Sequence, residues 1–183
     1  MAVNKSLFYK ELSKKDSNQK LQDLLKRKVK LQAGQHFKPG NIVFTSYNAK
    51  HKEFTYDKTP LVLILKRGSR YTLGLNFHWL PVPKRVLLIS EIMRRNKRNI
   101  EAGRPLDFDY NDLKPMLKNL DYAPCIRKYI NPRFGKIGVP IPPDRLMEVA
   151  RMKGQTFTNG KYSSEQLFRM AKKAGKKRNK MSK

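Results

Sequence analysis

The sequence predicts an α+β protein: a small, strongly curved antiparallel barrel of the SH3-like kind, followed by several short helices. Two observations predict this class. Short apolar segments separated by Gly and Pro turn signals fill residues 39–81, and helical patterns dominate after Pro83. We expect a basic N-terminal helix or arm over 1–34, a core of barrel and helices over 35–152, and a basic C-terminal helix and tail over 153–183.

The N-terminal region predicts an amphipathic helix over 16–33. Asp16 or Ser17 supplies an N-cap, and Gly34 provides a C-terminal stop. Leucines recur on one face of this helix and basic residues on the other. We expect the leucine face to dock on the core, which leaves the basic face free.

Strands are expected over 41–47, 54–56, 60–65 and 71–77. The Pro39-Gly40 pair is a turn signal before the first strand. The run 60–65 is continuously apolar, which indicates a strand buried on both faces. Gly68 can supply a positive φ in the hairpin turn that follows, and Gly74 indicates a bulge or a tight bend. Short strands around a bent hairpin favour a curved barrel.

Helical patterns are expected over 84–99, 110–120, 124–130 and 141–152, with a last helix that Ser163 or Ser164 caps. Pro83 suits the first helical position. Residues 131–140 are expected to form a loop. The basic residues in the last turn of the 84–99 helix suit both the helix dipole and a bound phosphate.

The formal net charge of +27 predicts a polyanionic partner, because self-repulsion of this size opposes a compact state. Residues 1–33 carry a net +6, residues 34–150 a net +11, and residues 151–183 a net +10. Cys125 is the only cysteine, which excludes an internal disulfide and a Cys-based zinc site. No apolar run is long enough for a membrane span. We expect DNA or RNA as partner and no membrane.

Catalysis should leave a constellation of residues, and the sequence carries none that is specific. The three histidines have no metal-binding spacing, and no cofactor motif is present. Asp107, Asp109 and Asp112 are best read as acids at a helix N-terminus. A metal-dependent nuclease built on those acids, or on Asp57 and His78, stays open as an alternative. The prediction is a protein that is not an enzyme and uses no cofactor or metal.

Binding leaves a clearer trace, because basic residues alternate with aromatic residues at several places, such as Arg127-Lys-Tyr129 and Arg133-Phe134. Aromatic rings stack on exposed bases while Lys and Arg neutralise phosphates. Tyr71, Phe77 and Trp79 are expected mainly in the core. The residues predicted to contact nucleic acid are Lys66, Arg67, Arg70, Arg94, Arg95, Lys97, Arg98, Arg127, Lys128, Arg133, Lys172, Lys173, Lys176, Lys177 and Arg178. No base-reading motif is present, so we expect contacts to the backbone and a steep salt dependence.

Residues 41–135 contain three segments that resemble a family of small basic proteins of tailed bacteriophages. The most specific part pairs YDKTPLV at 56–62 with LGLNFHWLP at 73–81; the other two segments are IVFTSYNAK at 42–50 and 125–134. The resemblance implies a phage setting, location in the host cytoplasm or the virion, and other phage or assembly proteins as partners. It carries over no catalytic residue.

The leading hypothesis is therefore a non-enzymatic phage protein that binds the DNA backbone with little sequence specificity, during genome packaging or handling or in the virion. Three alternatives stay open. They are a virion structural subunit that docks on acidic protein, a ribosomal or other ribonucleoprotein component, and the metal-dependent nuclease.

Overall fold

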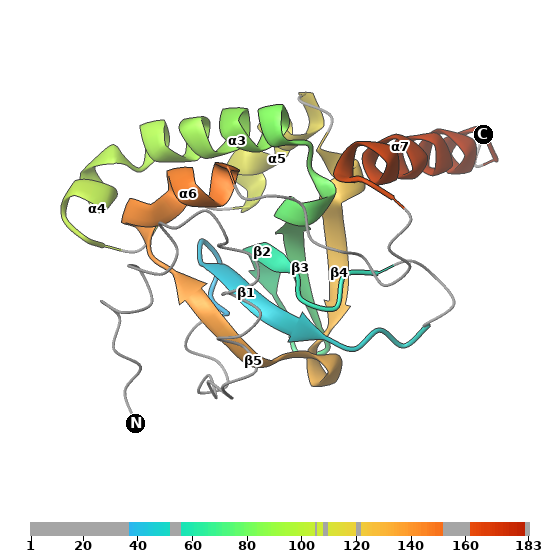
Figure 1. The fold of residues 1–183 in the computed structure, drawn as a ribbon, viewed down its shortest axis with the longest axis horizontal. Coiled ribbons are helices and arrows are strands. Elements are labelled where there is room, and N and C mark those ends of the chain that lie inside the picture. Colours follow the sequence, from blue (N-terminus) through green and yellow to red (C-terminus); the bar gives the residue numbers. More distant parts are fainter. Residues whose placement is uncertain are drawn as a thin grey trace.

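The computed structural model describes residues 37–51, 56–104, 106–107, 110–119, 122–151 and 162–181 (Figure 1). The strands are β1 (Ile42–Tyr47), β2 (Leu61–Arg67), β3 (Tyr71–Asn76), β4 (Ile126–Ile130) and β5 (Phe134–Ile141). The α-helices are α3 (Val82–Arg95), α4 (Lys97–Glu101), α5 (Tyr110–Asn119), α6 (Leu146–Arg151) and α7 (Ser164–Met181). Short 3₁₀ helices are η1 (Phe77–Trp79), η2 (Ala123–Cys125), η3 (Asn131–Arg133) and η4 (Pro143–Arg145).

The five strands form one antiparallel sheet in the order β4-β3-β2-β1-β5. The two edge strands, β4 and β5, follow each other in the chain and are joined only by η3. A connection this short requires the sheet to bend until its edges approach each other. At that point the rings of Tyr129 and Phe134 stack with centroids 4.3 Å apart. The α+β class is thus confirmed. The SH3-like barrel is not confirmed, because within the described residues no ladder pairs β4 with β5.

The bend of the sheet coincides with glycine. The register between β2 and β3 shifts between Ile64 and Lys66, opposite Gly74, as a bulge at this glycine predicts. Gly135 adopts φ +79°, and a Cβ there would lie 2.4 Å from the Phe37 ring. Any larger residue at Gly135 would therefore be strained in its backbone and would push Phe37 out of place.

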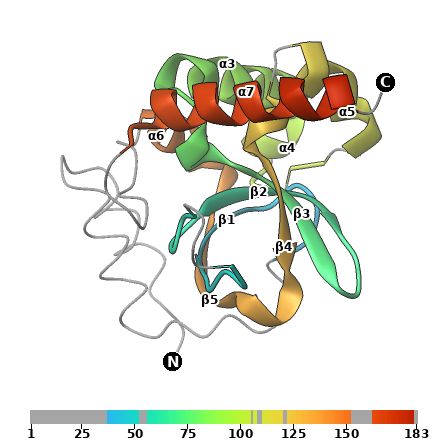
Figure 2. The same cartoon turned by 90° about the vertical axis from the view of Figure 1, so that its right-hand side faces the viewer.

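The sheet separates two apolar clusters, because alternate side chains of a strand point to opposite faces. Leu61, Leu63 and Leu65 enter the main core, which extends to the helices that gather on one side of the sheet (Figure 2). Val62 and Ile64 enter a smaller cluster on the other face, with the rings of Phe37, Tyr129 and Phe134. One face is therefore covered by helices, and the other encloses a small buried cluster within the bend of the sheet; we call them the helix-covered face and the inner face.

The C-terminal helix α7 is docked on the body by its first turns. Leu167 and Phe168 belong to the main core, and the Ser164 hydroxyl donates a hydrogen bond of 2.6 Å to the carbonyl of His78. The start of α7, where a capping serine is predicted, agrees with the structure. Within the described residues no helix has the length and the hydropathy that a membrane crossing requires.

Two predicted elements are wrong. Residues 126–130 form strand β4 rather than a helix, because they complete a ladder with β3, for example Leu73↔Lys128. Most of the expected loop 131–140 is strand β5, which pairs with β1; Pro140 is tolerated there because β5 is an edge strand. Gly68 does not adopt the positive φ expected for its turn. The predicted helix 16–33 lies outside the described residues, as does most of the strand expected at 54–56.

Candidate nucleic-acid interface

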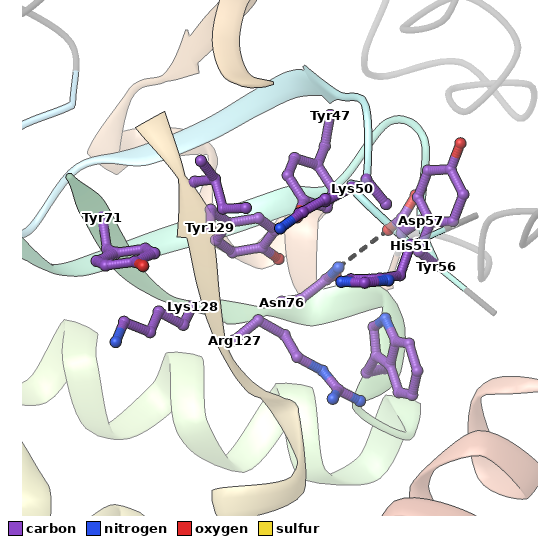
Figure 3. Close-up of a pocket in the computed structure, with 13 residues that line it drawn as sticks. Tyr47, Lys50, His51, Tyr56, Asp57, Tyr71, Asn76, Arg127, Lys128 and Tyr129 are labelled. Carbon is purple, nitrogen blue, oxygen red and sulfur yellow. Dashed lines mark hydrogen bonds between the residues drawn. The ribbon is translucent and has the colours of Figure 1, made fainter. Parts of the chain in front are cut away.

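A pocket of about 360 Å³ lies beside the edge strand β4 and is lined by residues from the ends of β1 and β3 and from the loop between β1 and β2 (Figure 3). Lys128 and Ile130 line it from one side of β4, and Arg127 and Tyr129 from the other, as the alternation of a strand dictates. The pocket therefore follows an exposed edge of the sheet rather than the centre of a face. We call it the β4 pocket.

Aromatic rings form much of the wall of the β4 pocket. The ring of Tyr47 meets the rings of Tyr129 and Tyr56 edge to face, with centroids 5.1 Å and 6.1 Å apart. Tyr71 also lines the pocket and is 42% exposed, the largest exposure of any tyrosine in the pocket wall. Edge-to-face packing holds a ring in one orientation, so the deep tyrosines form a rigid wall.

Cations lie directly against two of these aromatic residues. The Arg127 guanidinium is 3.7 Å from the ring centroid of Trp79, and the Lys128 Nζ is 4.0 Å from that of Tyr71. Lys50 also lines the pocket and is exposed. Cation–π contact fixes a flexible basic side chain in place while its charge stays available to an anion. The β4 pocket thus combines aromatic surface with positive charge.

A buried polar network closes the floor of the pocket. Asp57 Oδ2 lies 2.6 Å from His78 Nδ1 and accepts a hydrogen bond of 3.1 Å from the Asn76 amide, while Oδ1 accepts one from the Thr59 N–H. Asp57, Asn76 and His78 are each at most 3% exposed. Both carboxylate oxygens of Asp57 are thus engaged by the protein. Asp57 and His78 are the pair that the sequence allows as nuclease residues. In the structure their contact connects the loop after β1 to the segment that follows β3.

The buried hydroxyl of Tyr129 makes no hydrogen bond of good geometry within the described residues. Its side chain is 3% exposed, and Figure 3 shows the hydroxyl directed toward Asn76, which also lines the pocket. Burial raises the pKa of Tyr129 well above its ordinary value and the negative charge of Asp57 adds to this effect, whereas the charge of Arg127 and a contact with the Asn76 amide act in the opposite direction. The phenol therefore keeps its proton and remains a hydrogen-bond donor.

The structure gathers six of the predicted basic residues around β4 and the neighbouring turns: Lys66, Arg67, Arg70, Arg127, Lys128 and Arg133. Asn131 clamps the turn after β2 to η3, because its amide donates to the carbonyls of Gly68 and Ser69. Its own N–H donates to the Arg70 carbonyl over 3.0 Å. Residues from two distant parts of the sequence therefore form one basic end of the sheet.

The other predicted residues lie elsewhere. Arg94 and Arg95 are at the end of α3, and both donate hydrogen bonds of 2.7–2.8 Å to Glu91. These hydrogen bonds, first from Arg94 and then from Arg95, lower the pKa of Glu91 from 4.5 to about 2. Lys97 and Arg98 follow in α4, and Lys172 and Lys173 are exposed on α7. Lys176, Lys177 and Arg178 continue α7, but their side chains lie outside what the structure describes.

Several pocket residues were missing from the predicted set: Tyr47, Lys50, Tyr56, Asn76 and Tyr129. The alternation of basic and aromatic residues was the signal that pointed to this region, since Tyr56, Tyr71 and Tyr129 all belong to such stretches. Tyr71 was assigned mainly to the core and is instead exposed at the pocket, whereas Phe77 is fully buried as expected. Trp79, 8% exposed, belongs to the main core and also lines the pocket.

The sequence was also compared with known proteins. A family model described as Phage T4 terminal DNA protecting protein matches residues 8–171. The comparisons with curated proteins and with solved structures found no match. The family match confirms the phage setting expected from the resemblance, although it does not test the motif at 56–81. Because the match extends over most of the sequence, the chain belongs to the Phage T4 terminal DNA protecting protein family.

Proposed function

We propose that this protein is a non-enzymatic phage protein that holds DNA by its backbone and covers DNA ends. The observation that carries the proposal is the family match over residues 8–171, whose description names the protection of terminal DNA. The β4 pocket supports it, because cations and aromatic rings are the side chains that single-stranded DNA requires. The protein would act in the host cytoplasm, in the virion or in both, together with other phage proteins.

The proposed DNA contacts begin with the basic residues around β4, namely Arg70, Lys128 and Arg133, which are exposed. The basic regions 1–34 and 153–183 would extend these contacts along the duplex. Arg94 and Arg95 are weaker candidates because Glu91 already neutralises part of their charge. The bent sheet, with its edges joined by η3, is also the feature that supports the SH3-like assignment.

Backbone binding predicts a steep dependence on salt. A protein that makes about 6–10 phosphate contacts loses roughly 10³–10⁵ in affinity between 50 and 200 mM salt, because bound counterions are released. We expect this for duplexes of unrelated sequence, measured by fluorescence anisotropy with a labelled oligonucleotide. An affinity that hardly changed with salt would contradict the electrostatic contact.

End covering has its own experiment. Linear duplex DNA is incubated with the protein and then with an exonuclease. The control has the same sequence closed by hairpins at both ends, and a restriction cut opens it before the exonuclease is added. We expect the bound linear DNA to survive and the binding to the closed molecule to be weaker. Equal affinity for open and closed molecules would overturn end recognition while leaving DNA binding intact.

The non-enzymatic assignment is supported by the burial of Asp57 and His78, which leaves neither carboxylate oxygen of Asp57 open to a metal. Among the residues that the structure describes, no three or more His, Cys, Asp and Glu side chains gather as a metal site. Asp109 and the side chain of Asp112 lie outside that description. Nicking of plasmid DNA with magnesium or manganese, abolished by Asp107→Ala, would replace this proposal by the nuclease alternative.

Two simple experiments test the two remaining alternatives. Structured RNA that displaced duplex DNA efficiently would favour a ribonucleoprotein component. Retention of the protein on particles whose DNA has been digested would favour a virion subunit that docks on acidic protein.

A further inference from the structure

We propose that the β4 pocket takes one unpaired terminal nucleotide of the DNA, with its base against the tyrosine wall and its phosphate on the cations beside β4. This inference rests on the proposed function and names the chemical group that the protein would recognise at an end. The pocket, its tyrosine wall and the cations that line it carry it together, and the buried hydroxyl of Tyr129 adds to them.

The size of the pocket suits a single nucleotide. A volume of about 360 Å³ falls at the lower end of the range for small-molecule sites, and no double helix enters a hollow of this size. Bases inside a duplex are stacked and paired, and taking one out has a cost that is smallest where the strand is already unpaired. Only a frayed end, an overhang or a gap therefore presents a nucleotide to this pocket with a small free-energy cost of unpairing.

The tyrosine wall provides surface for a base. Tyr47, Tyr56 and Tyr129 are held edge to face by each other on one side of β4, and Tyr71 is exposed on the other side (Figure 3). Stacking on an aromatic ring tolerates every base, because each base has a π face. The pocket would thus bind a nucleotide without selecting among the four bases. A protein that covers DNA ends of any sequence requires this lack of base specificity.

The hydroxyl of Tyr129 makes no hydrogen bond of good geometry within the described residues, which leaves room for a polar ligand. A buried hydroxyl without a hydrogen bond is costly, and native proteins rarely leave one unsatisfied. Since the phenol keeps its proton, it would donate to an acceptor on the base edge, and all four bases carry ring nitrogens or carbonyl oxygens that accept. A purely apolar ligand would leave this cost in place.

The cations lie where the phosphate of such a nucleotide would emerge. Lys50, Arg127 and Lys128 all line the pocket, and Lys128 is held at 4.0 Å from the ring centroid of Tyr71. With the terminal base against the tyrosine wall, the next base of the overhang would lie against Tyr71 on the other side of β4, and the phosphate between the two bases would lie beside this ammonium group. A terminal phosphate, on either the 5′ or the 3′ side, adds charge that these cations would favour further.

The sole tryptophan gives the experiment a local reporter, because Trp79 lines the pocket. The full-length protein is titrated at fixed salt with three forms of one DNA: a duplex with a short overhang, the blunt duplex, and the duplex closed by hairpins. Overhangs with a 5′ phosphate, a 3′ phosphate or neither are compared. We expect the overhang to bind most tightly and to change Trp79 fluorescence, which the closed duplex leaves unchanged.

Three variants locate the effect. Tyr129→Phe removes only the hydroxyl, so the overhang preference should fall about 2- to 10-fold. Tyr71→Ala removes a stacking surface, so the preference should fall roughly 5- to 100-fold. Tyr122→Phe is the matched control, since it removes a buried hydroxyl that donates to the Lys84 carbonyl away from the pocket. It should leave the preference unchanged.

The outcomes separate this inference from the function on which it rests. If the wild type prefers ends but Tyr129→Phe and Tyr71→Ala keep that preference in full, end recognition stands and the pocket is not its site. If the wild type binds the closed duplex as tightly as the open forms, the proposed function fails first. Loss of preference in both pocket variants, with the control intact, supports the pocket.

Discussion

The helix-covered face and the inner face of the sheet differ in what they bury. On the helix-covered face the leucines of β2 join a continuous apolar core. On the inner face Val62 and Ile64 join a smaller cluster that also contains Tyr129, whose hydroxyl makes no hydrogen bond of good geometry within the described residues. Apolar burial is non-directional and stabilises, whereas buried polar groups are directional and costly when unpaired. One strand thus contributes stability through one set of side chains and supports the candidate site through the other.

Leu63→Ala should have the largest effect on stability. Leu63 is fully buried in the main core, so its truncation should lower the free energy of unfolding by about 2–5 kcal/mol. Urea unfolding followed by circular dichroism measures this loss. Overhang affinity of the folded protein should stay within about twofold. A large loss of affinity in protein shown to be folded would mean that the two faces are not separable.

Gly74→Ala tests the inner face directly. A Cβ at Gly74 would lie 2.2 Å from Val62 Cγ1 and 3.4 Å from Tyr129 Cε2. Overpacking of this kind costs about 1–3 kcal/mol and should displace Tyr129, so stability and overhang preference should fall together. Gly68→Ala is the matched control, because its nearest atom would be the Tyr71 carbonyl oxygen at 3.5 Å, an ordinary contact. Preference retained in Gly74→Ala would separate Tyr129 from the binding of ends.

Two buried tyrosines should respond differently to the loss of a hydroxyl. Tyr122 donates to the Lys84 carbonyl over 3.0 Å, so Tyr122→Phe should lower the free energy of unfolding by about 1 kcal/mol. Tyr129 makes no hydrogen bond of that quality within the described residues, so Tyr129→Phe should leave stability unchanged or raise it by about 1 kcal/mol. Urea unfolding of both variants decides the point. A clear destabilisation by Tyr129→Phe would show that its hydroxyl is already satisfied within the protein.

The sequence predicted the elements whose signal is local. The apolar run of β2, the bulge at Gly74 and the serine at the start of α7 are properties of short segments, and the structure agrees with each. Residues 126–130 carry a misleading local signal, because Ile126, Tyr129 and Ile130 have the spacing of one face of a helix. Their pairing with β3, more than 50 residues earlier in the chain, decides the outcome.

The candidate site was predictable in composition but not in position. Alternation of basic and aromatic residues pointed to 127–134, yet only the sheet brings these residues beside Tyr47, Asp57 and Asn76. A burial pattern predicted Tyr71 for the core, because strand alternation cannot show that the neighbouring strand β4 is an edge. The buried hydroxyl of Tyr129 has no sequence signal, since its hydrogen bonding depends on the surrounding fold.

Glu91→Gln should have the smallest effect and tests the helices rather than the pocket. The folded-state pKa of Glu91, about 2, lies below its ordinary value of 4.5, so its contribution to stability is present above about pH 4.5 and lost as pH falls toward 2. Because the group is near the surface, we expect a loss below about 1 kcal/mol at neutral pH and a flatter acid profile, measured by thermal unfolding. The variant also releases Arg94 and Arg95. If DNA binds at β4, the overhang preference should stay unchanged; a marked rise in that preference would place the contact on α3 instead.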